Sequence, residues 1–156
     1  MKVEKDYEEF LSLLNRHKVK YCIVGAFAVA FYAKPRYTKD LDILIEPSEE
    51  NAHRVYDVLK EFGFGSLNLS RKDLSQKGNI LQLGYEPVRI DILTEIEGLE
   101  FEQIWRNRAE GKYGSEKVNF ISLDDLIKTK KLSDRLSDKL DVELLEKSKK
   151  ENEQSG

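Results

Sequence analysis

The chain has 156 residues, of which 40% are hydrophobic and 35% charged, as is typical of one folded domain and not of a disordered chain. Its 26 lysines and arginines against 29 aspartates and glutamates give a net charge of −3, which argues against a protein that coats nucleic acid through a positive excess. The single cysteine, Cys22, excludes an internal disulfide, and no set of cysteines and histidines has the spacing of a zinc site.

Hydrophobic spacing in the first half of the chain predicts two helices and two strands. In chain order they are a helix over 6–17, a buried strand over 20–24, a buried helix over 26–33 and a strand over 40–45. Gly25 stands where the first strand turns into the second helix. Ser48 is the expected N-cap of a third helix that ends near residue 62. Such an alternation is typical of a sheet covered by helices.

The second half of the chain predicts a hairpin that interrupts this alternation. The expected elements are a hairpin of 79–83 with 88–93, a short helix over 99–107, a turn over 112–116, a strand over 118–121, a helix opened by Ser122 and a helix over 135–147. We therefore expect an α/β (α+β) fold, in which a small mixed β-sheet is flanked by helices and further helices stand at the C-terminal end.

The termini and the apolar runs bear on location and domain organisation. The charged start of the chain has no apolar signal-peptide core, and no apolar run is long enough to cross a bilayer. We expect a cytoplasmic protein that makes no membrane contact. From Ser148 onward the sequence becomes charged and polar, so we expect a single domain over residues 1–147 and a flexible charged tail over 148–156.

Two aspartates stand on the predicted strand 40–45. Because side chains alternate along a strand, Asp40 and Asp42 share one face while the residues between them point to the core. Neighbouring carboxylates repel each other and resist burial. A divalent cation resolves this repulsion, since Mg²⁺ binds one or two carboxylates together with substrate phosphates. The alternative is a strand end that leaves both carboxylates in water or against Arg36 and Lys39.

A third aspartate repeats the pattern on the predicted strand 88–93. Arg89 and Asp91 share one face of this strand, while Ile90 and Ile92 occupy the core face. If this strand lies beside the first aspartate strand, three carboxylates converge on one patch. Two-metal phosphoryl transfer requires such an arrangement.

Gly25 and Ala26 lie where a buried strand turns into a buried helix. The backbone N–H groups at a helix start have no intrahelical partner and can bind an anion such as phosphate. The alternative is a tight turn without any ligand. A glycine turn followed by Asp-x-Asp on the next strand is stronger evidence for a phosphate site than a glycine turn alone.

Two stretches of sequence occur in a distinctive order. Residues 24–30 read Val-Gly-Ala-Phe-Ala-Val-Ala, and residues 35–42 read Pro-Arg-Tyr-Thr-Lys-Asp-Leu-Asp. Together they resemble the opening motif of the nucleotidyltransferase superfamily related to DNA polymerase beta. The arginine and threonine before Asp-x-Asp are similar to those of minimal bacterial and archaeal members, including abortive-infection type toxins. A second stretch resembles the C-terminal motif of the same group. It consists of residues 121–127 together with Lys130, Arg135, Asp138 and Asp141.

This resemblance, over about residues 20–145, implies a metal-dependent transfer of a nucleoside monophosphate (NMP) from a nucleoside triphosphate (NTP) to a hydroxyl acceptor. By resemblance, Asp40 and Asp42 would hold both metal ions, Mg²⁺ or Mn²⁺. Asp91 would bind the catalytic ion and assist deprotonation of the acceptor. The implied nucleotide-binding residues are Gly25, Ala26, Arg36, Thr38, Lys130, Arg135 and Asp138. Ala26 departs from the family pattern, in which glycine or serine is usual, and offers a triphosphate only its backbone N–H.

The last predicted helix has two apolar stripes. Asp138 falls in one stripe with Val142 and Leu145, and a separate stripe consists of Leu136, Leu140 and Leu144. We therefore expect this helix to be inserted between layers. A carboxylate inside an apolar stripe needs a cationic partner, for which Lys130 and Arg135 are the candidates. We expect Asp138 to orient that cation towards the triphosphate; the alternative is a purely structural ion pair.

The acceptor and the partners stay open at the level of sequence. An RNA end such as that of tRNA, a protein side chain and a small molecule such as an antibiotic all offer a hydroxyl group. Minimal enzymes of this kind resemble one half of a two-protein, toxin–antitoxin type system, so a partner protein encoded nearby is a further hypothesis. A different class of function is a non-catalytic nucleotide- or partner-binding module that retains the fold. Pyrophosphate release from an NTP would distinguish it from an enzyme.

Overall fold

The computed structural model describes residues 3–33, 40–64, 71–85 and 88–155. Its elements, in chain order, are α1 (Lys5–Arg16), β1 (Tyr21–Val24), α2 (Gly25–Tyr32), β2 (Asp40–Ile45), α3 (Glu49–Leu59) with a π-helical turn η1 (Lys60–Phe64), α4 (Arg71–Ser75), β3 (Ile80–Tyr85), β4 (Val88–Leu93), α5 (Phe101–Asn107), β5 (Ala109–Tyr113), β6 (Glu116–Phe120), α6 (Leu123–Lys131) and α7 (Leu136–Ser155). This succession of strands and helices confirms the expected α/β fold.

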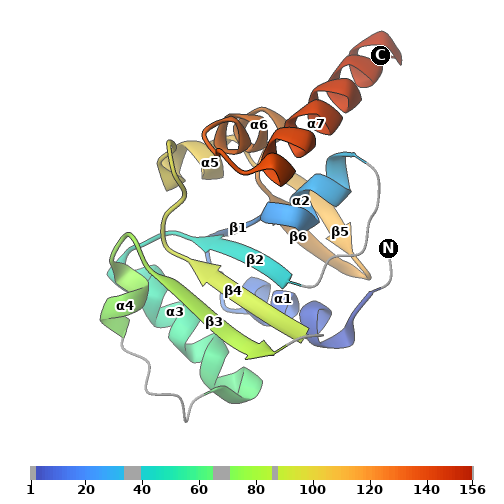
Figure 1. Cartoon of the computed structure of the whole chain (residues 1–156). Coiled ribbons are helices and arrows are strands. Elements are labelled where there is room, and N and C mark those ends of the chain that lie inside the picture. The colour runs from blue at the N-terminus through green and yellow to red at the C-terminus, as the bar shows by residue number, and fades with distance from the viewer. Residues whose placement is uncertain (1–2, 34–39, 65–70, 86–87, 156) are drawn as a thin grey trace.

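The strands form one mixed sheet of six strands in the order β3-β4-β2-β1-β6-β5 (Figure 1). Strands β2 and β4 are parallel, as are β1 and β6, whereas the pairs β1–β2, β3–β4 and β5–β6 are antiparallel. The two aspartate strands, β2 and β4, are therefore central neighbours. The sequence predicts that the three carboxylates share one patch if these two strands are neighbours, and the observed pairing meets that condition.

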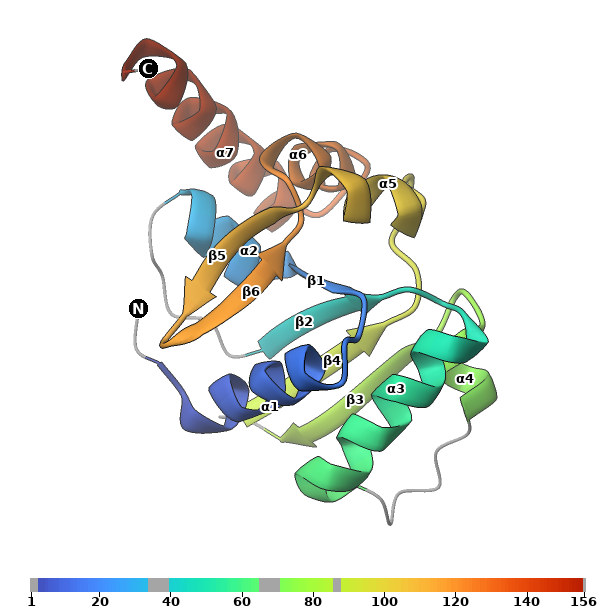
Figure 2. The same ribbon diagram turned by 180° about the vertical axis from the view of Figure 1, so that it is seen from behind.

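Helices cover the two faces of the sheet unequally. Figure 2 shows α1 and α3 across one face. Helix α2 packs against β1 and β2 on the other face, with α6 and α7 beyond it, and none of the described helices crosses the front of β4 and β3 in Figure 1. In β2 the alternation places Leu41, Ile43 and Ile45, all fully buried, on the face under α1 and α3. The aspartates of β2 consequently point to the open face.

Two predicted helix caps are present. The Ser48 hydroxyl accepts a hydrogen bond from the backbone N–H of Asn51 at the start of α3, and Ser122 does the same for Asp125 at the start of α6. Each cap satisfies one of the backbone N–H groups that a helix start leaves without an intrahelical partner. The cap before α6 fixes where the helix that bears Lys130 begins.

One strand was not expected from the sequence. Residues 109–113, Ala-Glu-Gly-Lys-Tyr, form β5, which pairs antiparallel with β6 at the edge of the sheet. Little of this segment is apolar and it contains a glycine, so alternation does not identify it as a strand. Its backbone pairing with β6 stabilises the segment as a strand although its residues have a low preference for that conformation. The predicted turn over 112–116 is correspondingly shorter, and the predicted strand 118–121 begins at Glu116.

The predicted end of the last helix at residue 147 is wrong, because α7 continues to Ser155. The Ser148 hydroxyl donates a hydrogen bond to the backbone carbonyl of Tyr32, and the Lys149 ammonium pairs with Asp124 on α6 at 2.7 Å. These contacts tie the polar segment to the body of the protein, a stabilisation that composition alone does not reveal. The assignment of residues 1–147 to one domain and of 148–156 to a separate tail stays a prediction.

The expectation that both apolar stripes of α7 are buried is also wrong. Leu145 is fully buried, but Leu136, Leu140 and Leu144 are 72%, 52% and 39% exposed. The helix packs by one side against α2 and α6 and presents the other side to solvent (Figure 1).

Among the helices of the described chain, none is long and apolar enough to cross a membrane.

Candidate functional site

The register of β2 against β4 places the carboxylates side by side. Asp42 lies directly opposite Asp91, and Asp40 lies directly opposite Arg89. Because parallel neighbours in register point to the same face, all four side chains lie on the open side of the sheet. The structure thus brings together the three predicted metal-binding aspartates and adds an arginine that the sequence prediction left unassigned.

Gly25 brings the start of α2 against Asp42. Its φ of +69° lies in the left-handed region, and a Cβ atom at this position would overlap the Oδ2 atom of Asp42. Val24, the residue before it, pairs with Asp42 across β1 and β2. Among the described residues no side chain caps the first turn of α2, so the backbone N–H groups of Gly25 and Ala26 can bind an anion beside the aspartates. This geometry agrees with the phosphate turn expected from the sequence.

Asp42 is held in an unfavourable electrostatic environment. Burial raises the pKa of its carboxyl group, and the charges of Asp91 and Asp40 raise it further, to about 6. The positive charges of Arg89 and Lys130 oppose this rise only in part. The cluster therefore has an excess of negative charge, which favours a bound cation.

Among the residues that the structure describes, Arg89 provides the nearest positive charge to this cluster. Its Nε and Nη2 atoms donate hydrogen bonds to the two carboxylate oxygens of Asp91, each at 3.0 Å, and its Nε lies 3.9 Å from Oδ1 of Asp40. The backbone of Arg89 is anchored by the Tyr7 hydroxyl of α1, which bonds both its N–H and its carbonyl at 3.1 Å. A bidentate ion pair between an arginine and a carboxylate is strong and directional.

The residues at the site fit a divalent cation in their chemistry. Oδ1 of Asp40 is buried and has no hydrogen-bond partner among the described residues, and Asp42 and Asp91 face each other across the strands. Carboxylate oxygens are the ligands that Mg²⁺ and Mn²⁺ prefer. Within the described ranges, however, no three histidine, cysteine, aspartate or glutamate side chains are arranged as a metal site. Both oxygens of Asp91 are instead bonded to Arg89.

A second charged cluster stands on α6 and α7. The Lys130 ammonium lies 2.9 Å from Asp138 and 3.1 Å from Asp141, and Arg135 pairs with Asp138 at 2.9 Å. Burial alone would raise the pKa of Asp138, but hydrogen bonds from Ser133, Lys130 and Arg135 outweigh it and lower that pKa to about 2. The expected partners of Asp138 are thus confirmed. Whether they contact a triphosphate stays a prediction.

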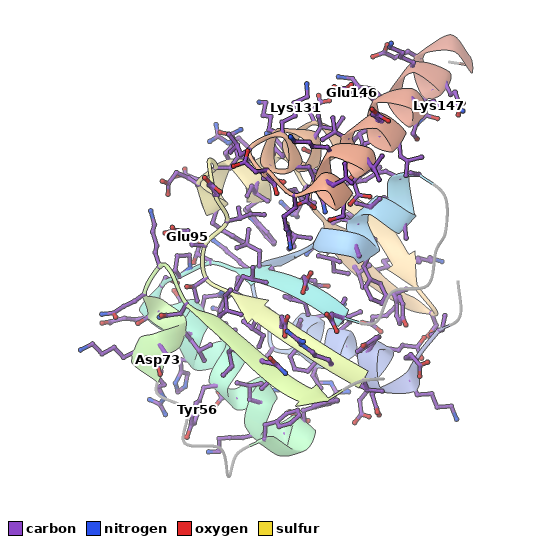
Figure 3. All side chains as sticks on the ribbon, viewed as in Figure 1. Tyr56, Asp73, Glu95, Lys131, Glu146 and Lys147 are labelled. Carbon is purple, nitrogen blue, oxygen red and sulfur yellow. The ribbon has the colours of Figure 1, made fainter. Side chains whose placement is uncertain are left out.

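Lys130 is distinguished from its neighbour by position. Its side chain is 13% exposed, and its positive charge is one of those that lower the pKa of Asp42. Lys131, by contrast, is 57% exposed and pairs with Glu146 on α7 (Figure 3). The lysines of α6 are therefore not equally exposed to solvent: Lys130 is mostly buried against Asp138 and Asp141, whereas Lys131 lies at the surface.

Not every predicted site residue can be placed. Arg36 and Thr38, together with Lys39, lie outside the described residues. Two residues of the site, Arg89 and Asp141, were noted in the sequence but given no role. A role could have been expected because Arg89 stands two residues before Asp91 on the same strand face, and because Asp141 follows Asp138 by one helical turn within the resembling motif.

A groove of about 450 Å³ lies at the other ends of β2 and β4, away from the aspartates. Its lining includes four glutamates, Glu46, Glu95, Glu100 and Glu102, against one lysine, Lys77, so its net charge is negative; Glu95 is labelled in Figure 3. A triphosphate would be repelled by this lining. The cluster around Asp42 is therefore the better candidate for nucleotide chemistry.

The structure predicts that Gly25→Ala destabilises the protein through Asp42. The left-handed backbone costs an alanine about 1–3 kcal/mol, and the new Cβ would also displace the Asp42 carboxylate. Urea unfolding should show a larger loss than for Gly78→Ala, whose φ is +87° but whose Cβ would meet open space. The excess loss should shrink in an Asp42→Ala background. An equal loss in both backgrounds would contradict the close approach.

Comparison with known proteins agrees with this geometry. Residues 3–155 match the sequence model of the family described as nucleotidyl transferase of unknown function (DUF2204). The chain belongs to this family. No curated protein matches it significantly. Among solved structures, the lincosamide antibiotic adenylyltransferase LnuA, determined with lincomycin bound, is similar with a TM-score of 0.57 and 18% identity, over 92% of this chain and 96% of LnuA. At this identity the likeness establishes the nucleotidyltransferase fold.

Proposed function

We propose that this DUF2204 member is a metal-dependent nucleotidyltransferase that moves an NMP from an NTP to a hydroxyl group. The observation that supports this proposal is the pairing of Asp42 with Asp91 across β2 and β4, beside the uncapped start of α2. The grouped carboxylates can bind a divalent cation, and the backbone N–H groups beside them can bind the phosphates of an NTP.

The proposed reaction asks for positioning and charge stabilisation more than for covalent chemistry by the protein. The acceptor oxygen forms a bond to the α-phosphorus, the bond between that phosphorus and the bridging oxygen breaks, and pyrophosphate leaves. The proton of the acceptor hydroxyl passes to a carboxylate, which by family resemblance is Asp91. Bound Mg²⁺ or Mn²⁺, held by Asp40, Asp42 and Asp91, would supply neutralisation of the phosphate charge.

The chain's own cations and N–H groups would orient the NTP. The N–H groups of Gly25 and Ala26 would bind phosphate oxygens at the start of α2, and Lys130, held by Asp138 and Asp141, would bind the triphosphate. Arg36, Thr38 and Arg135 are assigned to the nucleotide by resemblance alone. Ala26 offers no hydroxyl group, so it would contribute only through its backbone.

We propose the chemical class of the acceptor, a hydroxyl group. It belongs to an RNA end such as that of tRNA, to a protein side chain or to a small molecule. LnuA is described as acting on a lincosamide antibiotic, which is one example of the third class. An abortive-infection type relationship and a partner protein encoded nearby, as in a toxin–antitoxin pair, are part of the same proposal. Both rest on sequence resemblance.

The test is transfer of label from each of the four NTPs, labelled at the α-phosphorus, to total tRNA, to a protein mixture or to a panel of hydroxylated antibiotics. We expect Mg²⁺- or Mn²⁺-dependent pyrophosphate release with one acceptor class, and none from the Asp42→Asn variant. NTP binding without release in any mixture would favour the alternative, a binding module that retains the fold. Absence of both binding and release would refute the proposal.

The bond between Arg89 and Asp91 yields a prediction about metal affinity. A cation that binds Asp91 must compete with Arg89, which now occupies both oxygens of that carboxylate. Arg89→Met should therefore bind Mn²⁺ more tightly, by about tenfold if the competition is worth about 1.4 kcal/mol. Its melting temperature without metal should fall, because Asp42 and Asp91 lose the positive charge of Arg89.

This prediction can be measured by titrating Mn²⁺ in the absence of nucleotide and following free Mn²⁺ by electron paramagnetic resonance. Arg106→Met is a matched control, since Arg106 is exposed on α5. Weaker or unchanged Mn²⁺ binding by Arg89→Met would show that Arg89 supports the metal site instead of competing with it.

A further inference from the structure

Three leucines form an exposed stripe on α7, which we call the α7 stripe: Leu136, Leu140 and Leu144. They are 72%, 52% and 39% exposed and recur every four residues, so they lie on one side of the helix. Single exposed leucines are ordinary on protein surfaces, but an aligned set on one helix marks an interaction surface.

The α7 stripe is held in a fixed position. On the other side of the helix, Asp138 and Asp141 pair with Lys130, and Leu145 is fully buried. The C-terminal half of α7 projects beyond the rest of the molecule in both views (Figures 1 and 2). The stripe itself lies in the N-terminal half, at residues 136–144, where its leucines are exposed and can be contacted by another helix.

The charges beside the stripe are self-complementary. At 100° per residue, Lys139 and Glu143 lie about 100° and 60° to one side of Leu140, and Ser137 lies about 60° to the other. Lys139 and Glu143 are both exposed, and neither forms an ion pair with another residue in the described part of the chain. One flank of the stripe thus exposes charges of both signs. On the other flank Ser137 is exposed, whereas Asp141, about 100° from Leu140, is buried and paired with Lys130.

We propose that the α7 stripe pairs with the α7 stripe of a second copy of this chain, in an antiparallel arrangement about a two-fold axis near Leu140. In an antiparallel pair like flanks meet, so Lys139 of each copy comes opposite Glu143 of the other. Leu136 then faces Leu144 of the second copy, and the two Leu140 side chains meet at the axis. In a parallel pair the charged flank would instead face Ser137 and Asp141, and Asp141 is buried and already paired with Lys130.

The arrangement also accounts for a neighbouring apolar residue. Leu132, at the end of α6, is 51% exposed and precedes the α7 stripe by four residues. Leu132 precedes α7, so the helical register does not reach it, but it adds exposed apolar surface within four residues of Leu136. The contact would thereby extend beyond the three leucines, towards the size that a specific interface needs.

Sedimentation velocity of the full chain, from about 1 µM to about 500 µM, tests the proposal. We expect a monomer–dimer equilibrium. Leu140→Asp should shift it to monomer at every concentration with little change in melting temperature, because Leu140 is exposed in the single chain. Ile80→Asp, a matched change at a residue that is 70% exposed on β3, should leave the dimer intact.

A charge exchange distinguishes self-pairing of the α7 stripe from binding of a different protein. Lys139→Glu should weaken dimerisation at least tenfold, since it places two glutamates opposite each other twice, and the double variant Lys139→Glu/Glu143→Lys should restore it. A chain that is monomeric throughout, as expected if the stripe binds a different protein, would overturn the proposal. So would a dimer that survives Leu140→Asp, or a double variant that stays monomeric.

Discussion

Asp42→Asn is expected to abolish nucleotidyl transfer and to make the protein without metal more stable at neutral pH. Asp42 faces Asp91 across two parallel strands and lies against the start of α2, so its charge is central to the proposed cation site. Loss of a metal ligand removes several kcal/mol of charge stabilisation, which corresponds to a rate loss of at least about a hundredfold.

The gain in stability follows from the sign of the pKa shift. The pKa of Asp42 is raised from 3.8 to about 6, so between these values the folded protein holds a proton that the unfolded chain releases. The parent protein therefore loses stability as the pH rises from about 4 through about 6. Asparagine removes this loss, which after a discount for partial exposure amounts to roughly 1–2 kcal/mol at pH 7.

Two measurements check the Asp42 prediction. Thermal unfolding at pH 5 and pH 7 should show a smaller pH dependence for Asp42→Asn than for the parent, and Mn²⁺ with NTP should raise the melting temperature of the parent only. Asp57→Asn, on the exposed surface of α3, is the matched control. A variant that kept metal-dependent stabilisation would remove Asp42 from the site.

Lys130→Met is expected to lower both stability and NTP affinity. The Lys130 ammonium lies within 3.1 Å of two buried carboxylates, those of Asp138 and Asp141, so its loss leaves buried negative charge poorly compensated. Breaking a buried pair costs about 3–5 kcal/mol, and retention of Arg135 beside Asp138 favours the lower end of that range. NTP affinity should fall about tenfold or more, since a charged hydrogen bond is worth about 1.5–3 kcal/mol.

Matched variants separate the two effects of Lys130. Lys131→Met removes only a surface pair with Glu146, which should change the unfolding free energy by less than about 1 kcal/mol and leave NTP binding intact. Lys130→Arg keeps the positive charge if Lys130→Met fails to fold. Urea unfolding and NTP titration give the two readouts. A folded variant that lacks the Lys130 ammonium but binds NTP as the parent does would establish a purely structural ion pair.

The sequence alone predicted the aspartates and the faces on which they lie. A period of two on strands 40–45 and 88–93 places Asp40, Asp42 and Asp91 opposite the core residues, because backbone geometry alternates side chains whatever the surroundings. Ser48 and Ser122 were likewise recognisable as caps, since the orphan N–H groups of a helix start are satisfied locally. These features depend on residues close together in the chain.

Only the tertiary structure decided which of these local features meet. The parallel pairing of β2 with β4 joins segments almost fifty residues apart and places Arg89 on Asp91 beside Asp40 and Asp42. Strand β5 forms because β6 pairs with it, and α7 continues past residue 147 where contacts to α2 and α6 hold it. One leucine stripe of α7 stays exposed because α2 and α6 cover only the other side. Periodicity states that a helix side is apolar, whereas long-range packing determines whether the chain itself covers it.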